Sequence, residues 1–199
     1  VRTSPLHDRL AARGACFGEM SGWERANWYA PAGVEPKYEY TFGRQNWFPY
    51  SAEEHMAARE NVAVFDQTSF GKYLVQGKEA LDLLEWTCGN RIDVPVGKVV
   101  YTQLLNERGG IEGDVTVTRV AERQFLVYTT ASSQAHDFWY LQKRIDERDF
   151  AATITDITSA YAVLGVMGPR SRELLQRVSN ADFSNEAFPF ATSQVIDFG

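Results

Sequence analysis

The sequence has few of the residues that mark disulfide-stapled or metal-binding folds. Its 199 residues include only two cysteines and three histidines. Cys16 and Cys88 lie far apart, with no C-x-x-C spacing and no neighbouring histidine. His7, His55 and His136 are equally scattered. This pattern indicates two reduced, buried thiols, and it argues against a disulfide framework, a metal site or a thiol nucleophile.

Long runs of one chemical character are also missing. No apolar stretch approaches the ~18 residues that a membrane span requires, and no signal-peptide pattern is recognisable. The 20 basic residues are scattered among 26 acidic ones, which gives a net charge of −6 and argues against a nucleic-acid partner. The G-x-G-x-x-G turn is absent as well, so we expect no dinucleotide-binding fold in this chain.

What remains is an ordinary globular composition, 44% hydrophobic and 13% aromatic. A chain of this length buries roughly 70% of its unfolded surface, enough for one or two packed domains. Apolar periodicity predicts an α+β fold with antiparallel or mixed sheets and helices packed on one face. The expected helices are 5–13, 52–60, 78–87, 132–148 and 170–178. The expected strands are 62–65, 70–76, 99–105, 114–120, 124–130, 151–157 and 160–166.

We divide the chain after residue 50. Residues 1–50 are expected to form an irregular, aromatic-rich arm with a short N-terminal helix, because Pro and Gly interrupt any period over 22–50. Residues 51–199 are expected to form the main domain, beginning with Ser51 as a helix N-cap and Glu54 completing a capping box. The chain starts at Val1 rather than Met and stops at Gly199. We therefore expect a piece of a larger protein, truncated at the C-terminus.

The most informative segment is a predicted hairpin with its bend at 106–110. Gly109 and Gly110 supply the positive φ angles that tight hairpin turns require. The second strand then carries Asp114, followed by Thr116 and Thr118 on the same face, because alternate residues of a strand point the same way. The turn therefore fixes where the Asp114 carboxylate points.

This hairpin, with Tyr101 on its first strand, resembles a pattern of the folate-dependent aminomethyltransferases, the glycine-cleavage T-protein and its relatives. Four further blocks look like the same family in order and spacing. They are residues 3–6, 22–24, 58–66 and 165–169. Together the blocks extend over nearly the whole chain.

Other segments narrow the resemblance. Residues 2–5, 22–29, 46–48 and 69–72 are similar to the folate-binding region fused behind the flavin domain in dimethylglycine and sarcosine dehydrogenases. The stretch 29–50 is also longer than a free-standing T-protein carries there. The resemblance implies tetrahydrofolate as cofactor, FAD in a flavin domain elsewhere in the same polypeptide, and a small N-methyl amine as substrate. It also implies a cytoplasmic location in a bacterium or a mitochondrial matrix location, with no membrane partner.

The resemblance assigns roles residue by residue. Asp114 matches the acid that assists transfer of the one-carbon unit, by moving a proton or by stabilising positive charge. Many T-proteins have two consecutive acids here, whereas this chain has Gly113 in the first position. Thr130 stands where T-proteins usually carry an asparagine. The expected folate-binding residues are Phe70, Tyr101, Thr116, Thr118, Tyr128 and Thr130. The far side of the pocket is expected beyond Gly199.

Three functions follow from the resemblance. The first is the folate-binding region of a flavin-dependent dimethylglycine- or sarcosine-type dehydrogenase, which passes a methylene unit from an oxidised N-methyl amine to tetrahydrofolate. The second is a free-standing aminomethyltransferase. The third is a non-catalytic relative, like the regulatory subunit of pyruvate dehydrogenase phosphatase. Asp114 and Tyr101 favour an enzyme, whereas Gly113 and Thr130 keep the third function open.

Overall fold

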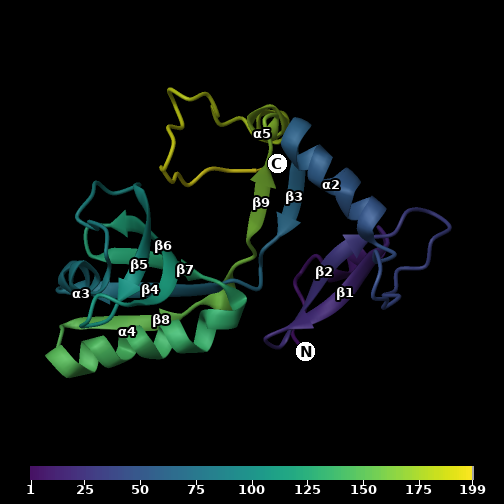
Figure 1. Ribbon diagram of the computed structural model, residues 1–199. Coiled ribbons are helices and arrows are strands. Elements are labelled where there is room, and N and C mark those ends of the chain that lie inside the picture. Colours follow the sequence, from purple (N-terminus) through teal and green to yellow (C-terminus); the bar gives the residue numbers. More distant parts are fainter. Residues whose placement is uncertain (199) are drawn as a thin grey trace. The chain divides into compact units, whose positions relative to one another are not determined.

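The computed structural model describes residues 1–198 and divides into two compact units (Figure 1). The first unit contains residues 1–69 and 162–181 together with Phe198, and the second contains residues 70–161 and 182–197. The division after residue 50 stays a prediction, because compactness alone does not define folding domains. Within residues 1–198 no helix combines the length and the apolar character that crossing a membrane requires.

The first unit is built from two small antiparallel sheets and three helices. One sheet is the β1–β2 hairpin and the other pairs β3 with β9, which is distant in sequence. A small core of Cys16, Trp28 and Ala30 lies under the hairpin, with Tyr50 stacked on Trp28 at 5.5 Å between ring centroids. The elements are α1 (His7–Ala11), β1 (Ala15–Met20), β2 (Trp23–Tyr29), α2 (Phe48–Glu60), β3 (Ala63–Asp66), β9 (Leu164–Met167) and α5 (Ser171–Val178).

The β1–β2 hairpin corrects the expectation of an irregular arm, because β2 occupies part of 22–50. Ser21 and Gly22 form its two-residue turn with φ angles of +52° and +81°. Two consecutive residues with positive φ make the turn type that matches the twist of antiparallel strands. The Ser-Gly dipeptide was therefore the signal for this hairpin.

Helix α2 begins four residues earlier than expected, at Phe48. Pro49 lies in its first turn, where the fixed φ of proline suits a helix and its missing N–H is not needed. Ser51 consequently lies inside the helix, and the expected capping box with Glu54 is wrong. The Glu54 carboxylate instead accepts a hydrogen bond from the backbone N–H of Tyr29 at 3.1 Å.

The second unit is a five-stranded antiparallel sheet in the order β5-β6-β7-β4-β8. Strand β5 (Val99–Leu105) has the predicted bounds, and the other expected strands are confirmed with ends shifted by a few residues. The remaining elements are β4 (Gly71–Gly77), α3 (Ala80–Thr87), β6 (Ile111–Ala121), β7 (Gln124–Thr129), η1 (Ala131–Ser133), α4 (Gln134–Arg148), β8 (Ala152–Asp156) and η2 (Thr158–Ala160).

The core of the second unit lies on one face of this sheet, where α3 and α4 pack (Figure 1). We call it the helix face. Alternate residues of the central strands point into it, and leucines of the two helices fill it from the other side. These residues are Tyr73, Val75, Leu83, Leu84, Leu104, Val115, Val117, Phe125, Val127, Leu141 and Ile145. The structure thus confirms an α+β fold with helices on one face of the sheet.

Candidate functional site

The candidate site is on the opposite face of the sheet, which we call the Asp114 face. It depends on the turn between β5 and β6. The backbone N–H of Asn106 donates to the Gly110 carbonyl at 2.9 Å, and the Asn106 side-chain oxygen accepts from the N–H groups of Arg108 and Gly110. Gly109 has a φ of +75°, as the turn requires. The predicted bend at 106–110 is confirmed.

Asp114 is exposed, and two side chains of the neighbouring strand orient its carboxylate. The Tyr101 hydroxyl donates to Oδ1 at 2.9 Å, and the Gln103 amide donates to the same oxygen at 3.0 Å. No group among residues 1–198 donates to Oδ2. The carboxylate is therefore held through one oxygen, and the other is left able to take a proton or to meet a positive charge.

Strand register brings most of the expected residues into adjacent rows. Tyr101 pairs with Thr116, and Thr116 pairs with Tyr128, so the three cross the sheet in one row. The next row begins with Gln103 paired to Asp114. Tyr101 is 62% exposed, whereas Tyr128 is half-buried, and burial raises the pKa of the Tyr128 phenol. One tyrosine thus offers an accessible ring and the other a neutral hydroxyl.

Phe70 and Thr130 lie at the strand ends of this second row. Thr129 pairs with Gly71, so the next residues outward, Thr130 and Phe70, are level with each other. The β6–β7 register places Thr130 level with Asp114. The Thr130 hydroxyl contacts those of Ser132 and Ser133 at 3.1 and 3.3 Å.

Thr118 is less closely associated with the other expected residues. It is buried, and it pairs with Val99 and Leu126, roughly 13 Å along β6 from Asp114.

Sequence reasoning missed two residues of this face. Gln103 lies two positions after Tyr101, so the alternation already applied to β6 would have found it. Lys72 is in register with Tyr128 and almost completely buried, and its ammonium donates to the Phe70 carbonyl at 2.9 Å. A single lysine in an apolar strand gave no signal.

The neighbours of Asp114 on β6 have other roles. Glu112 lies at a bulge in the β5–β6 register, and its carboxylate accepts from the Asn106 amide at 2.7 Å, so it supports the turn. Gly113 lies against Asp137 of α4. Within the part of the chain that the structure describes, no group of three or more His, Cys, Asp or Glu side chains could hold a metal ion.

Comparison with known proteins shows which family the chain resembles in sequence. The sequence profile described as GCVT N-terminal domain matches residues 6–199. The chain is 49% identical over 197 residues to the 4-methylaminobutanoate oxidase (formaldehyde-forming) of Paenarthrobacter nicotinovorans, covering 99% of this chain and 24% of that protein. It is 31% identical over 234 residues to the mitochondrial sarcosine dehydrogenase of Mus musculus, covering 98% and 25%.

Two further matches extend the comparison. The chain is 35% identical over 194 residues to the mitochondrial pyruvate dehydrogenase phosphatase regulatory subunit of Mus musculus, covering 95% of this chain and 22% of that protein. The crystal structure of the glycine cleavage system aminomethyltransferase T from Bartonella henselae matches with a TM-score of 0.76 at 24% identity, covering 96% and 46%, and supports the fold alone. The chain spans about a quarter of the length of these curated relatives.

Proposed function

The chain belongs to the GCVT N-terminal domain family, and from that premise we propose that it is the folate-binding region of a flavin-dependent dehydrogenase or oxidase of N-methyl amines. In this proposal the region receives the methylene unit released by amine oxidation and passes it to tetrahydrofolate. FAD belongs to another part of the same polypeptide. Among the curated relatives, a sarcosine dehydrogenase and a 4-methylaminobutanoate oxidase support this placement.

The observation that carries the proposal is the Asp114 carboxylate, fixed through Oδ1 and accessible at Oδ2. Tetrahydrofolate, when bound, supplies the two nitrogen atoms that take up a one-carbon unit. Each nitrogen must lose a proton on the way, and the carbon unit is cationic when it arrives. A preoriented carboxylate can accept the proton or stabilise the cation, and acid–base assistance of this kind contributes typically 10²–10⁴-fold.

The surroundings of Asp114 suit a pterin. A flat heteroaromatic ring needs an apolar wall and a few hydrogen-bonding groups at its edge. Tyr101 offers an exposed ring beside the carboxylate, and the hydroxyl groups of Thr116 and Tyr128 follow in the same row. Thr130, level with Asp114, offers one hydroxyl where an asparagine would offer two polar groups, so we expect weaker recognition of the pterin edge there.

The 49% identical relative points to a competing fate for the oxidised N-methyl group, namely release as formaldehyde. That enzyme is described as formaldehyde-forming, and formaldehyde is what an oxidised N-methyl group yields when water reaches it first. A tethered folate site competes with water because tethering raises the effective concentration of the acceptor. The proposal therefore predicts that folate diverts carbon away from formaldehyde.

Calorimetric titration of 5-formyltetrahydrofolate into the full-length protein tests the proposal, with Asp114→Asn measured beside the wild type. We expect saturable binding to both, because Asn keeps the shape and the hydrogen-bonding contacts of Asp. During amine oxidation the variant should then form methylenetetrahydrofolate about 10²–10⁴-fold more slowly than the wild type. If the complete protein bound no reduced folate, Asp114 would have no role in one-carbon transfer and the proposal would fail.

The regulatory relative favours one other function. At 35% identity, the pyruvate dehydrogenase phosphatase regulatory subunit is a match that is not named as an oxidase or a dehydrogenase. A non-catalytic binding module would keep the sheet but would not need an accessible Oδ2. Full-length protein that binds folate yet neither oxidises amines nor forms methylenetetrahydrofolate would support this second function.

A further inference from the structure

Directly behind the Asp114 strand lies a second carboxylate, that of Asp137 on α4. Asp137 is 0% exposed and shares the buried stripe of α4 with Leu141 and Ile145, at spacings of four residues. A carboxylate is strongly disfavoured in such a place unless hydrogen bonds compensate it. The Thr129 hydroxyl donates to Oδ2, and the Nδ1 atom of His136 lies 2.9 Å from Oδ1. The group is thus held by β7 on one side and by its own helix on the other.

Strand β6 passes against this carboxylate at the residue before Asp114. A Cβ atom placed on Gly113 would lie 2.8 Å from Oδ1 of Asp137 and 3.2 Å from Oδ2. Only glycine allows the backbone to come so close. A larger residue at position 113 would therefore have to displace the Asp137 carboxylate from its place under the strand.

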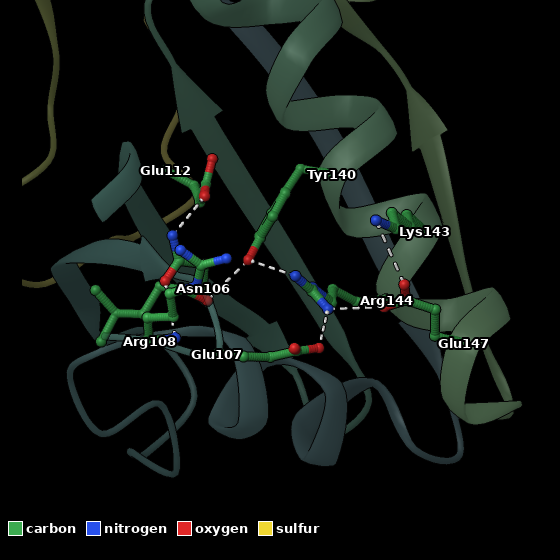
Figure 2. Close-up of polar contacts among 9 residues, drawn as sticks. Asn106, Glu107, Arg108, Glu112, Tyr140, Lys143, Arg144 and Glu147 are labelled. Atoms are coloured by element: carbon green, nitrogen blue, oxygen red, sulfur yellow. Dashed lines mark hydrogen bonds and ion pairs between the residues drawn. The ribbon is translucent and has the colours of Figure 1, made fainter. Parts of the chain in front are cut away.

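Other side chains of α4 hold the same hairpin further along. The Tyr140 hydroxyl donates to the Leu105 carbonyl at 2.8 Å and accepts from the Arg144 guanidinium at 3.0 Å. Arg144 also reaches Glu107 at 3.3 Å, as Figure 2 shows. His136 lies 3.7 Å from the Glu112 carboxylate. Helix α4 thus contacts the β5–β6 hairpin before, within and after its turn.

These contacts determine the direction of Asp114. Successive residues of a strand point to opposite faces, so the side of Gly113 that rests on Asp137 is opposite to the side from which the Asp114 carboxylate projects. Tyr101 and Gln103 fix the carboxylate from the front, and α4 fixes its backbone from behind. Proton transfer depends on such placement, since a shift of about 1 Å can cost 10²-fold in rate.

We propose that Asp137 is a positioning residue for Asp114, acting through the backbone of Gly113, and that Tyr140 supports it through Leu105. The inference rests on the proposed function, because it assigns Asp137 a role in capturing the methylene unit. Asp137 does not touch the folate in this account. It therefore affects the transfer step rather than the affinity for folate.

The test measures three quantities in the full-length protein: the thermal midpoint, the dissociation constant of 5-formyltetrahydrofolate, and the rate of methylenetetrahydrofolate formation during amine turnover. The variants are Asp137→Asn and the milder Tyr140→Phe, which removes one hydroxyl and keeps the ring. Asp146→Asn is the matched control, because it changes a carboxylate of the same helix that contacts Gln142 on the exposed side. Each variant is also combined with Asp114→Asn.

We expect Asp137→Asn to slow transfer by about 10- to 100-fold and to change the folate dissociation constant by less than about twofold. Tyr140→Phe should slow transfer by a few-fold, and Asp146→Asn should not slow it. In the Asp114→Asn background, Asp137→Asn should slow transfer no further, because residues that act through one another are not additive. A purely structural role would give the same loss in both backgrounds.

Two sets of results overturn the inference, and they are distinguishable from each other. If Asp114→Asn slows transfer strongly while Tyr140→Phe and a folded Asp137→Asn protein transfer normally, the positioning role is wrong and the proposed function stands. The positioning role is also wrong if Asp137→Asn slows transfer by the same factor with and without Asp114→Asn. If Asp114→Asn itself transfers normally, the assignment of Asp114 fails and the positioning role fails with it. Should Asp137→Asn not fold, Tyr140→Phe decides alone, with normal transfer overturning the inference.

Discussion

The two faces of the five-stranded sheet are built from the same strands but follow different rules. Side chains on the helix face are almost all apolar and completely buried, such as Val115 and Val117 of β6. On the Asp114 face the intervening residues of β6 are polar, and several are accessible to solvent. Packing explains the apolar residues of the first face, whereas it explains neither the exposed Tyr101 ring nor the Asp114 carboxylate. Residues that packing leaves unexplained are the ones to examine for function.

The two carboxylates of this region show the same contrast. Asp137 on the helix face is buried with partners for both oxygens, whereas among residues 1–198 the donors to Asp114 reach one oxygen only. A buried and fully partnered carboxylate organises the structure around it. An accessible oxygen on a preoriented carboxylate is available for proton transfer.

The largest effect that separates the faces should be on stability. Phe125 is completely buried on the helix face, and truncation of a buried phenylalanine costs about 3–5 kcal/mol. We expect Phe125→Ala to lower the free energy of unfolding by that amount in denaturant titrations. Tyr101→Ala, on the other face, removes an exposed ring and one hydrogen bond and should lower it by no more than about 1.5 kcal/mol. Similar losses for the two variants would contradict the comparison.

The next effect is smaller and concerns the rate of one-carbon transfer when Tyr101 no longer donates to Asp114. Tyr101→Phe keeps the ring and removes one hydrogen bond, a change of about 0.5–1.5 kcal/mol. We expect methylenetetrahydrofolate formation to slow by about two- to tenfold, and the thermal midpoint to fall by no more than about 4 °C. The amount of reduced folate bound at saturation should stay the same. An unaltered transfer rate would mean that the Tyr101 hydroxyl does not orient the catalytic carboxylate.

The smallest effect is a pH dependence that arises on the helix face. Burial raises the pKa of the Cys88 thiol to about 12 from its ordinary value of 9.0. The unfolded chain therefore loses this proton at lower pH than the folded protein does, so the contribution of this thiol to stability is constant below about pH 8 and decreases as the pH rises through 9. At pH 10 the loss should reach about 1 kcal/mol.

Cys88→Ala provides the control for that pH dependence. Its free energy of unfolding should fall less steeply between pH 8 and 10 than that of the wild type. Alkylation of Cys88 in the native protein at pH 8 should also be slow, because the reactive thiolate is rare. Parallel stability curves for the two proteins would show that the thiol titrates normally.

Much of this fold was predictable because alternation and glycine turns are local signals. Strand β5 and the bend at 106–110 were placed correctly on that basis. Helix α2 was placed too late because Ser51 is a plausible cap, while the influence of Pro49 on the first helical turn was overlooked. The β3–β9 pairing joins segments about a hundred residues apart, and no local pattern encodes such a contact.

Of the residues around β6, only those on the Asp114 face were predictable from the sequence. Asp114 and Tyr101 were identified from motif resemblance, and the structure places them in hydrogen-bonding contact. Asp137 was missed because an acidic residue in a helix is usually solvated. Its spacing of four from Leu141 was nevertheless a signal that it lies on the buried stripe.

The most direct test of the account measures how carbon from the oxidised N-methyl group divides between formaldehyde and methylenetetrahydrofolate. The full-length wild type and Asp114→Ala are compared at saturating amine and reduced folate. The account predicts equal rates of amine oxidation, with formaldehyde the main product only in the variant. Equal formaldehyde yields from the two proteins would contradict a role for Asp114 in one-carbon transfer.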